Sequence, residues 1–188
     1  MIEDAKKEAR YTYADYCSWD DGKRWELIDG VAYAMSPAPG RRHQQTIGAF
    51  FSQLHSFLKG NPCKVYMAPF DVRLNADGAD DTVVQPDVLV VCNRAKLDEH
   101  GCKGAPDLII EVVSPSSGSR DFIKKFQIYL RAGVREYWVA DPQEKVVQVF
   151  MLDGNRYVGS AFEGGARIPV GVLPGCVVDL EGVFVDDY

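Results

Sequence analysis

Apolar residues recur with helical spacing in two segments of the chain. In residues 43–58 they fall three or four positions apart, and the Gly-Asn-Pro stretch at 60–62 then disfavours a helix. In residues 119–132 they again mark one face, and Gly133 follows as a typical helix-ending residue. The pattern predicts one helix over residues 43–58 and another over residues 119–132, beginning at residue 119 or 120.

Continuous apolar runs bounded by polar or turn residues predict buried strands. Four such runs occupy residues 64–74, 83–92, 108–114 and 134–141. Because the last two are separated by a predicted helix, they have the order of a strand–helix–strand unit.

Both ends of the chain carry hairpin patterns. Asp29-Gly30 lies between short strand-like runs at 25–28 and 31–35, and Asp153-Gly154 lies between similar runs at 145–152 and 155–162. A short helix over residues 11–19, capped by Thr12, precedes the first hairpin. We therefore expect a single α/β domain over residues 1–188, with a mixed central β-sheet flanked by helices and hairpins added at both ends.

Composition supports one ordinary globular domain. The chain has 188 residues, 46% of them hydrophobic, and no apolar stretch approaches the length of a membrane span or a signal peptide. The five cysteines are odd in number and never form a CxxC pair, which predicts reduced thiols in a cytoplasmic protein. They are Cys17, Cys63, Cys92, Cys102 and Cys176.

The net charge of −6 argues against a strong general affinity for nucleic acid. The charge is unevenly distributed, because residues 41–135 hold 13 Lys and Arg against 10 Asp and Glu, whereas the two flanks hold 8 against 17. The middle of the chain is thus mildly basic, which permits a substrate that carries phosphate groups.

Two acidic residues in aliphatic strands are the first candidates for chemistry. Glu111 interrupts the run at 108–113, where an ionised carboxylate is costly unless something compensates it, and Asp87 precedes the aliphatic run at 88–91. If neighbouring strands bring both acids to one place, their charges repel, and a Mg²⁺ ion would relieve the repulsion. The structural alternative is that each acid pairs with an arginine or caps a backbone amide. Asp107 also follows a proline, but it belongs to the same strand as Glu111, so we expect it to anchor the start of that strand.

The helix predicted after Glu111 supplies a candidate cation. At about 100° per residue, Lys125 lies at the edge of its apolar face, whereas Lys124 points toward solvent. Asp121 and Lys125 form an i,i+4 pair beside the core. Lys125 could simply extend its ammonium group to solvent, but the helix follows the Glu111 strand directly. We therefore favour Lys125 over Lys124 as the lysine of a site.

These residues resemble the PD-(D/E)XK nuclease superfamily and, more narrowly, the Uma2 family of restriction endonuclease-like proteins. The resemblance covers about residues 12–180. It rests on five linked motifs: "ELIDGVAY" (26–33), "SPAP" with a following histidine (36–43), "QPDVLVV" (85–91), "GAPDLIIEVVSPSS" (104–117) and "DFIKKFQIYLRAGVREYWVADP" (121–142). The superfamily places a lysine two residues after its second acid, where this chain has Val113. True acid-x-lysine triplets occur only at 4–6 and 21–23, before any Pro-Asp pair. The family resemblance implies a lysine moved to the following helix, which agrees with the placement of Lys125.

The resemblance also implies a restriction endonuclease-like core, DNA as substrate and a Mg²⁺ or Mn²⁺ cofactor. Asp87, Glu111 and Lys125 would be the catalytic residues. Further site residues implied by the family pattern are Glu26, His43 and Gln85, with Asp121 beside Lys125. The metal would be held by Asp87 and Glu111, with the Val112 carbonyl and Glu26.

Two other functions remain open from the sequence. A nuclease fold that has kept its shape without cleavage would be a binding module, and the acidic net charge favours it. A glycoside hydrolase would also use two carboxylates, but it gives the helix lysine no role. A homodimer is plausible for an enzyme that cuts both strands of a duplex.

Overall fold

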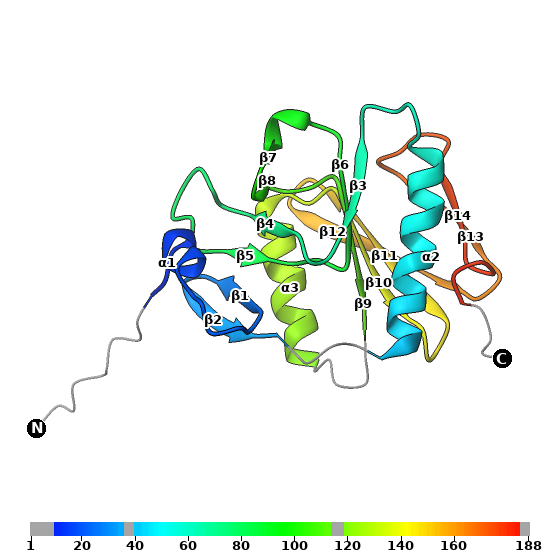
Figure 1. Cartoon of the computed structure of the whole chain (residues 1–188). Coiled ribbons are helices and arrows are strands. Elements are labelled where there is room, and N and C mark those ends of the chain that lie inside the picture. Colours follow the sequence, from blue (N-terminus) through cyan, green and yellow to red (C-terminus); the bar gives the residue numbers. More distant parts are fainter. Residues whose placement is uncertain (1–9, 36–39, 114–118, 185–188) are drawn as a thin grey trace, which may run out of the picture.

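The computed structural model describes residues 10–35, 40–113 and 119–184 of the chain. A central sheet separates two layers, which Figure 1 shows on either side of it. One layer holds the long helix α2, and the other holds α3 and a second sheet. The predicted fold class, a mixed sheet flanked by helices, is confirmed, and the second sheet was not expected.

The central sheet has six strands in the order β12-β11-β10-β9-β6-β3. Only β9 and β10 are parallel, and α3 (Ser119–Ala132) connects them. All other neighbours are antiparallel. The strands are β3 (Lys64–Met67), β6 (Val88–Val91), β9 (Leu108–Val112), β10 (Glu136–Asp141), β11 (Val146–Asp153) and β12 (Arg156–Glu163).

One face of the central sheet packs against α2 (Arg41–Phe57) and the C-terminal segment. Phe50 and Leu54 of α2 are fully buried there, and Phe50 meets the ring of Trp138 edge-on at a centroid distance of 6.0 Å. The C-terminal segment adds the two-stranded sheet of β13 (Arg167–Pro169) and β14 (Val177–Asp179). Burial of these apolar side chains is the main force that holds this layer on the sheet.

The opposite face packs against α3 and the second sheet, whose strand order is β2-β1-β5-β4-β8-β7. Ile128 and Tyr129 of α3 are buried in this layer. The short helix α1 (Tyr13–Cys17) begins after Thr12, as predicted, and lies against β1. The strands are β1 (Trp25–Ile28), β2 (Val31–Ala34), β4 (Asp71–Arg73), β5 (Val83–Val84), β7 (Leu97–Asp98) and β8 (Gly101–Lys103).

Both helices and both hairpins follow the sequence prediction closely, but two predicted strands were wrong in extent. The run 64–74 is divided into β3 and β4, and the run 83–92 into β5 and β6, with the halves in different sheets. Each break contains a proline, Pro69 or Pro86. Because proline has no N–H to donate to a strand ladder, it interrupts pairing and lets the chain cross between sheets. The segment 94–103, with a 3₁₀ turn (Arg94–Lys96), β7 and β8, was also not predicted.

The expectation of five reduced thiols was wrong, because Cys63 and Cys92 form a disulfide. The register pairs Lys64 with Val91, so the next step along the two strands sets these cysteines opposite each other. Counting cysteines could not reveal this, since it depends on strand pairing. Disulfides are uncommon in reducing cytoplasm, so the cysteine argument for a cytoplasmic location no longer holds.

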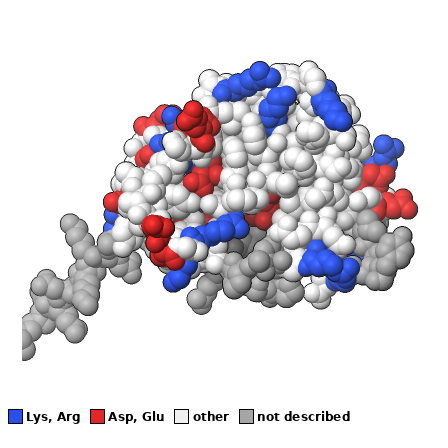
Figure 2. Space-filling view, in the orientation of Figure 1, with Lys and Arg blue, Asp and Glu red and all other residues white. Residues whose placement is uncertain are grey.

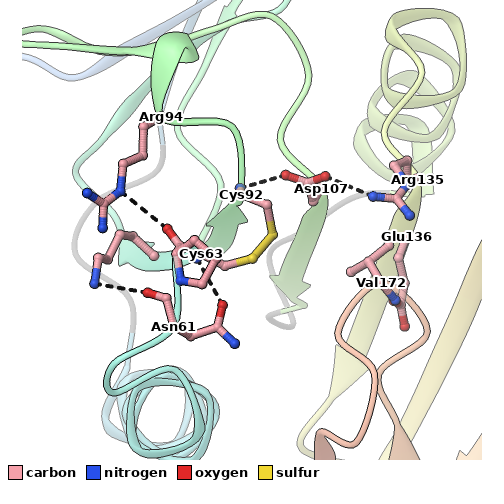
Figure 3. Close-up of a disulfide and its surroundings, with 10 residues drawn as sticks. Asn61, Cys63, Cys92, Arg94, Asp107, Arg135, Glu136 and Val172 are labelled. Atoms are coloured by element: carbon pink, nitrogen blue, oxygen red, sulfur yellow. Dashed lines mark hydrogen bonds and ion pairs between the residues drawn. A yellow bond between two sulfur atoms is a disulfide. The ribbon is translucent and has the colours of Figure 1, made fainter.

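The disulfide lies beside Asp107, which anchors the start of β9 (Figure 3). One carboxylate oxygen of Asp107 accepts a hydrogen bond from the Cys92 N–H at 2.7 Å, and the other accepts one from Arg135 at 3.1 Å. The side chain of Asp107 is thus engaged in holding strands together, which agrees with its predicted structural role.

Charge is divided over the face of the molecule that Figure 2 shows. Lys and Arg side chains line its upper edge, and Asp and Glu side chains cluster on the side of α1 and the β1–β2 hairpin. Within the described ranges, no helix is both long and apolar enough to cross a membrane.

Candidate active site

The pairing of β6 with β9 places Asp87 beside Glu111. Val88 lies opposite Ile110 in this antiparallel pair, so one further step sets the two acids opposite each other. The Asp87 side chain also binds the backbone of β9, because the Val112 N–H donates a hydrogen bond to Asp87 Oδ2 at 2.8 Å. The two strands therefore bring both predicted acids to one place at the edge of the paired region.

Glu111 projects from the central sheet toward α3. Its Oε1 accepts hydrogen bonds from Lys125 Nζ at 3.1 Å and from the Tyr129 hydroxyl at 2.6 Å. Burial raises the pKa of Glu111 to about 7, and the charges of Asp87 and Glu26 also raise it, while Lys125 and Tyr129 act in the opposite direction. The Glu111 carboxyl group therefore ionises less readily than an ordinary glutamate, even with the Lys125 ammonium group beside it.

Glu26 reaches the same lysine from the second sheet. Its Oε1 lies 3.2 Å from Lys125 Nζ and accepts the backbone N–H of Gln85 at 3.1 Å. The Lys125 side chain is only 11% exposed, and its ammonium group joins Glu26 of β1 to Glu111 of β9. Lys125 is therefore a buried cation between two buried carboxylates, one from each sheet.

His43 approaches the cluster from the first turn of α2. Its Nε2 lies 3.4 Å from Asp87 Oδ2. Burial lowers the pKa of His43, but the Asp87 carboxylate and the Val112 carbonyl outweigh that effect, so the pKa is raised overall. The other ring nitrogen, Nδ1, is buried without a hydrogen-bond partner in the described part of the chain. An unpaired buried polar atom of this kind often marks a place for a ligand or water.

The structure thus gathers most of the predicted site residues in one cluster. We call the set Glu26, His43, Asp87, Glu111 and Lys125 the acid–lysine cluster. Gln85 contacts it through its backbone. The side chain of Asp121 lies outside the described residues, as do the loops at 36–39 and 114–118. The catalytic roles of all these residues stay predictions.

Lys124 differs from its prediction. Its ammonium group lies over the ring of Tyr33, 3.8 Å from the ring centroid, and the residue is half-buried. Helical spacing correctly placed Lys124 away from the apolar face of α3. The prediction that it points toward solvent was wrong, because β2 covers that side of the helix. Lys124 therefore makes a cation–π contact beside the acid–lysine cluster.

Two polar residues that contact this site were not predicted from the sequence. Tyr129 lies in the segment 119–132, whose apolar face was predicted without singling out this residue, although its hydroxyl binds Glu111. Burial and the Glu111 charge raise its pKa well above the ordinary value, so the hydroxyl stays protonated and donates a hydrogen bond to Glu111. Arg24 was not considered, and it binds the side chain of Gln85. The spacing of Tyr129 four residues after Lys125 was the available signal.

A second buried acid, Glu136, belongs to the core and not to the cluster. Its carboxylate accepts hydrogen bonds from Trp138 Nε1 at 2.8 Å and from the Val172 N–H at 2.9 Å. This acid joins β10 to the C-terminal segment. Glu136 is thus an example of a buried acid with a purely structural role, the role that the sequence also allowed for Asp87 and Glu111.

The acid–lysine cluster fits Mg²⁺ better than it fits a metal that needs a full protein cage. Within residues 10–35, 40–113 and 119–184, no three His, Cys, Asp or Glu side chains meet as a ready-made ligand set. Mg²⁺ does not need one, because it usually binds through one or two carboxylates together with water and substrate oxygens. Burial raises the pKa of Glu111, and the charges of Asp87 and Glu26 add to this effect, so a divalent cation bound beside these acids would favour the ionised carboxylate.

A mixed sheet with acids on two neighbouring strands and a lysine on the following helix defines a restriction endonuclease-like protein. The sequence matches the model of the Uma2 family, described as "putative restriction endonuclease", over residues 12–181. The chain therefore belongs to the Uma2 family.

One solved structure supports the same fold. It is the crystal structure of "a putative nuclease belonging to DUF820" from Anabaena variabilis ATCC 29413, with a TM-score of 0.74 and 21% sequence identity. The match covers 93% of this chain and 97% of that one. No curated protein matches the sequence.

Proposed function

We propose that this protein is a metal-dependent endonuclease that hydrolyses phosphodiester bonds in DNA. The observation that carries the proposal is Lys125 Nζ, which lies 3.1 Å from Glu111 and 3.2 Å from Glu26, with Asp87 beside them. Membership of the Uma2 family and the nuclease-like fold support it.

In this mechanism Asp87 and Glu111 would hold Mg²⁺ or Mn²⁺, with Glu26 and the Val112 carbonyl as further ligands. When bound, the metal would lower the pKa of a water molecule and polarise a phosphate oxygen. The Lys125 ammonium group would donate hydrogen bonds to the phosphate and stabilise the negative charge that develops on it.

Three residues would hold the acids in place. The Tyr129 hydroxyl donates a hydrogen bond to Glu111 Oε1, and the Val112 N–H donates one to Asp87 Oδ2. His43 contacts the same Asp87 oxygen and carries a raised pKa, so it can supply a proton or a positive charge near the departing oxygen. These contacts fix the orientation of both carboxylates before a substrate arrives.

The alternative is a binding module with the nuclease fold and no cleavage, which the net charge of −6 favours. A glycoside hydrolase is less well supported, because it gives no role to Lys125, which binds Glu111 together with the fully buried Tyr129.

Cleavage assays on plasmid and single-stranded DNA test the proposal. Purified protein with Mg²⁺ or Mn²⁺ should cut, and EDTA should abolish cutting. Asp87→Asn, Glu111→Gln and Lys125→Met should each lower the rate by about 10²–10³, as expected when a group that stabilises developing charge is lost. Asp107→Asn is the matched control, since Asp107 also follows a proline but bonds to Cys92 and Arg135.

The outcomes separate the alternatives. Cutting that survives Glu111→Gln would come from a contaminant and would refute the site. Failure of the folded wild-type protein to cut any substrate would favour the binding module.

We also propose that the enzyme acts as a homodimer, because two-fold-related sites can cut both strands of a duplex. A solution mass of twice 20.9 kDa by light scattering would support this, and a monomer at the working concentration would refute it.

A further inference from the structure

Gln85 connects the acid–lysine cluster to an arginine on the surface. It is buried in the turn between β5 and β6, and its backbone N–H donates to Glu26 Oε1 at 3.1 Å. Its side-chain Oε1 accepts hydrogen bonds from two nitrogens of Arg24, with Nε at 3.0 Å. Its side-chain Nε2 donates to Asp71 Oδ1 at 2.8 Å and to the Tyr16 hydroxyl at 3.0 Å. One residue therefore holds both Glu26 and Arg24.

The orientation of the Gln85 amide follows from these partners. The Asp71 carboxylate can only accept hydrogen bonds, so it must face the amide nitrogen, and the amide oxygen then faces Arg24. Arg24 presents two nitrogens to this one oxygen, which fixes the plane of its guanidinium group.

The guanidinium of Arg24 keeps its charge available. Other arginines of this protein bind carboxylates, as Arg73 binds Asp80 and Arg135 binds Asp107. In the described structure Arg24 makes its side-chain hydrogen bonds to the neutral Gln85 amide and to no carboxylate. It is also exposed to solvent. A positive group that is oriented but not neutralised is suited to binding an anion from outside.

Arg24 lies at the edge of the acid–lysine cluster. The Met35 N–H donates to the Arg24 carbonyl, which continues the β1–β2 pairing by one residue. Side chains two apart on a strand share a face, so Arg24 projects on the same side as Glu26. Glu26 in turn contacts Lys125.

We propose that Arg24, oriented by Gln85, binds a phosphate of the nucleic-acid backbone next to the one that is cleaved. This inference rests on the proposed function and extends it. Arg24 would be a substrate-binding residue, and Gln85 would be a positioning residue that acts through it. Planar guanidinium groups bind phosphate oxygens in pairs, so a fixed plane favours one path of the backbone across the site.

Binding is measured separately from cleavage, by fluorescence anisotropy of a labelled DNA duplex in EDTA over a range of salt concentrations. Arg24→Gln should weaken binding roughly tenfold at low salt, since it removes a charged hydrogen-bond donor. The slope of log affinity against log salt should become shallower by about 0.9, the change expected for one lost phosphate contact. Arg24→Lys should keep the slope and recover part of the affinity.

Gln85→Met tests the positioning role. It keeps the arginine but removes the amide that orients it, so we expect weaker binding with a nearly unchanged salt slope. A purely structural role for Gln85 would lower the melting temperature without this separation of affinity from slope. The matched control is Arg156→Gln, because Arg156 is 74% exposed and pairs with Asp153 on the distant β11–β12 hairpin.

The possible results are distinct. Equal binding and slope for Arg24→Gln and Arg156→Gln would overturn the inference, even if the wild type cuts DNA. Wild-type binding that depends on Arg24 without any cleavage would support the inference and refute the proposed enzyme. No binding of DNA by the wild type in EDTA would overturn the inference, and the cleavage assay with Mg²⁺ or Mn²⁺ would still decide the proposed enzyme on its own.

Discussion

Replacing Lys125 by methionine should destabilise the protein strongly and in a pH-dependent manner. Methionine keeps most of the aliphatic length but removes the charge that lies 3.1 Å from Glu111 and 3.2 Å from Glu26. Removing one partner of a buried ion pair costs about 3–5 kcal/mol, because the remaining charge is left uncompensated in a poorly solvated site. We expect a loss of unfolding free energy of about 3 kcal/mol at pH 8.

The pH dependence follows from the raised pKa of Glu111. In the folded protein this pKa is about 7, against 4.5 for an unperturbed glutamate. Between these values the folded state binds the proton more tightly, so stability is greatest at the acidic end and falls as pH rises, by about 1.4 kcal/mol per pH unit. Without Lys125 the folded pKa rises further, and the decline continues to higher pH. The difference between wild type and Lys125→Met should therefore be small at pH 5 and largest at pH 8.

Urea denaturation followed by circular dichroism at both pH values measures this difference. Lys124→Met is the control, since loss of its contact with Tyr33 should cost at most about 1 kcal/mol at either pH. Adding Glu111→Gln to Lys125→Met should restore much of the stability, because a neutral amide needs no cation. If Lys125→Met were no worse than Lys124→Met at pH 8, or if its cost were independent of pH, the lysine would not be compensating buried charge.

Three further predictions concern the fold. A thiol reagent should modify the exposed Cys17 quickly, the buried Cys102 and Cys176 only after unfolding, and the Cys63–Cys92 pair only after reduction. Cys63→Ser should lower the free energy of unfolding, measured by urea denaturation, by up to about 4 kcal/mol, because the disulfide closes a loop of about 29 residues. Gly101→Ala should prevent folding or lower the melting temperature by more than 10 °C, roughly 3 kcal/mol or more, because the new Cβ would lie 2.1 Å from the carbonyl oxygen of Asp71 at a φ of +141°; a melting temperature within a few degrees of wild type would contradict this. Glu136→Ala should cost about 3 kcal/mol in the same assay, since it leaves two buried N–H groups without their acceptor, and a cost under 1 kcal/mol would show that water replaces the carboxylate.

Local patterns predicted the elements of this fold better than their pairing. The helices at 41–57 and 119–132 and both hairpins follow from spacing and turn residues, which act within a few positions of the chain. The division of residues 64–74 and 83–92 between two sheets depends on which strands meet, and apolar runs carry no such information. The same reason explains the missed disulfide, because the Cys63–Cys92 contact follows from the register of β3 against β6.

The candidate site divides in the same way. Asp87 and Glu111 could be found from the sequence, because an acid in an aliphatic strand is costly and needs a reason. Glu26 could not, since its hairpin gave no sign of facing the central sheet, and only the family resemblance pointed to it. Tyr129 went unnoticed although its spacing from Lys125 was a signal. Arg24 went unnoticed because its contact with Gln85 joins two elements, where spacing along one strand gives no direction.

The position of the lysine also follows from the fold. Glu111 of β9 and Val113, which directly follows this strand, lie on the same face as Ile109, and that face packs against α3. A lysine at residue 113 would have to reach back along the strand to the carboxylate. The helix that connects β9 to β10 must cross this face of the sheet. A lysine on the side of α3 that faces the sheet therefore reaches the Glu111 carboxylate directly. Val113 is then free to pack with the apolar side chains of this layer. In the proposed mechanism only the position of the ammonium group matters, so a lysine on α3 can serve in place of one at residue 113.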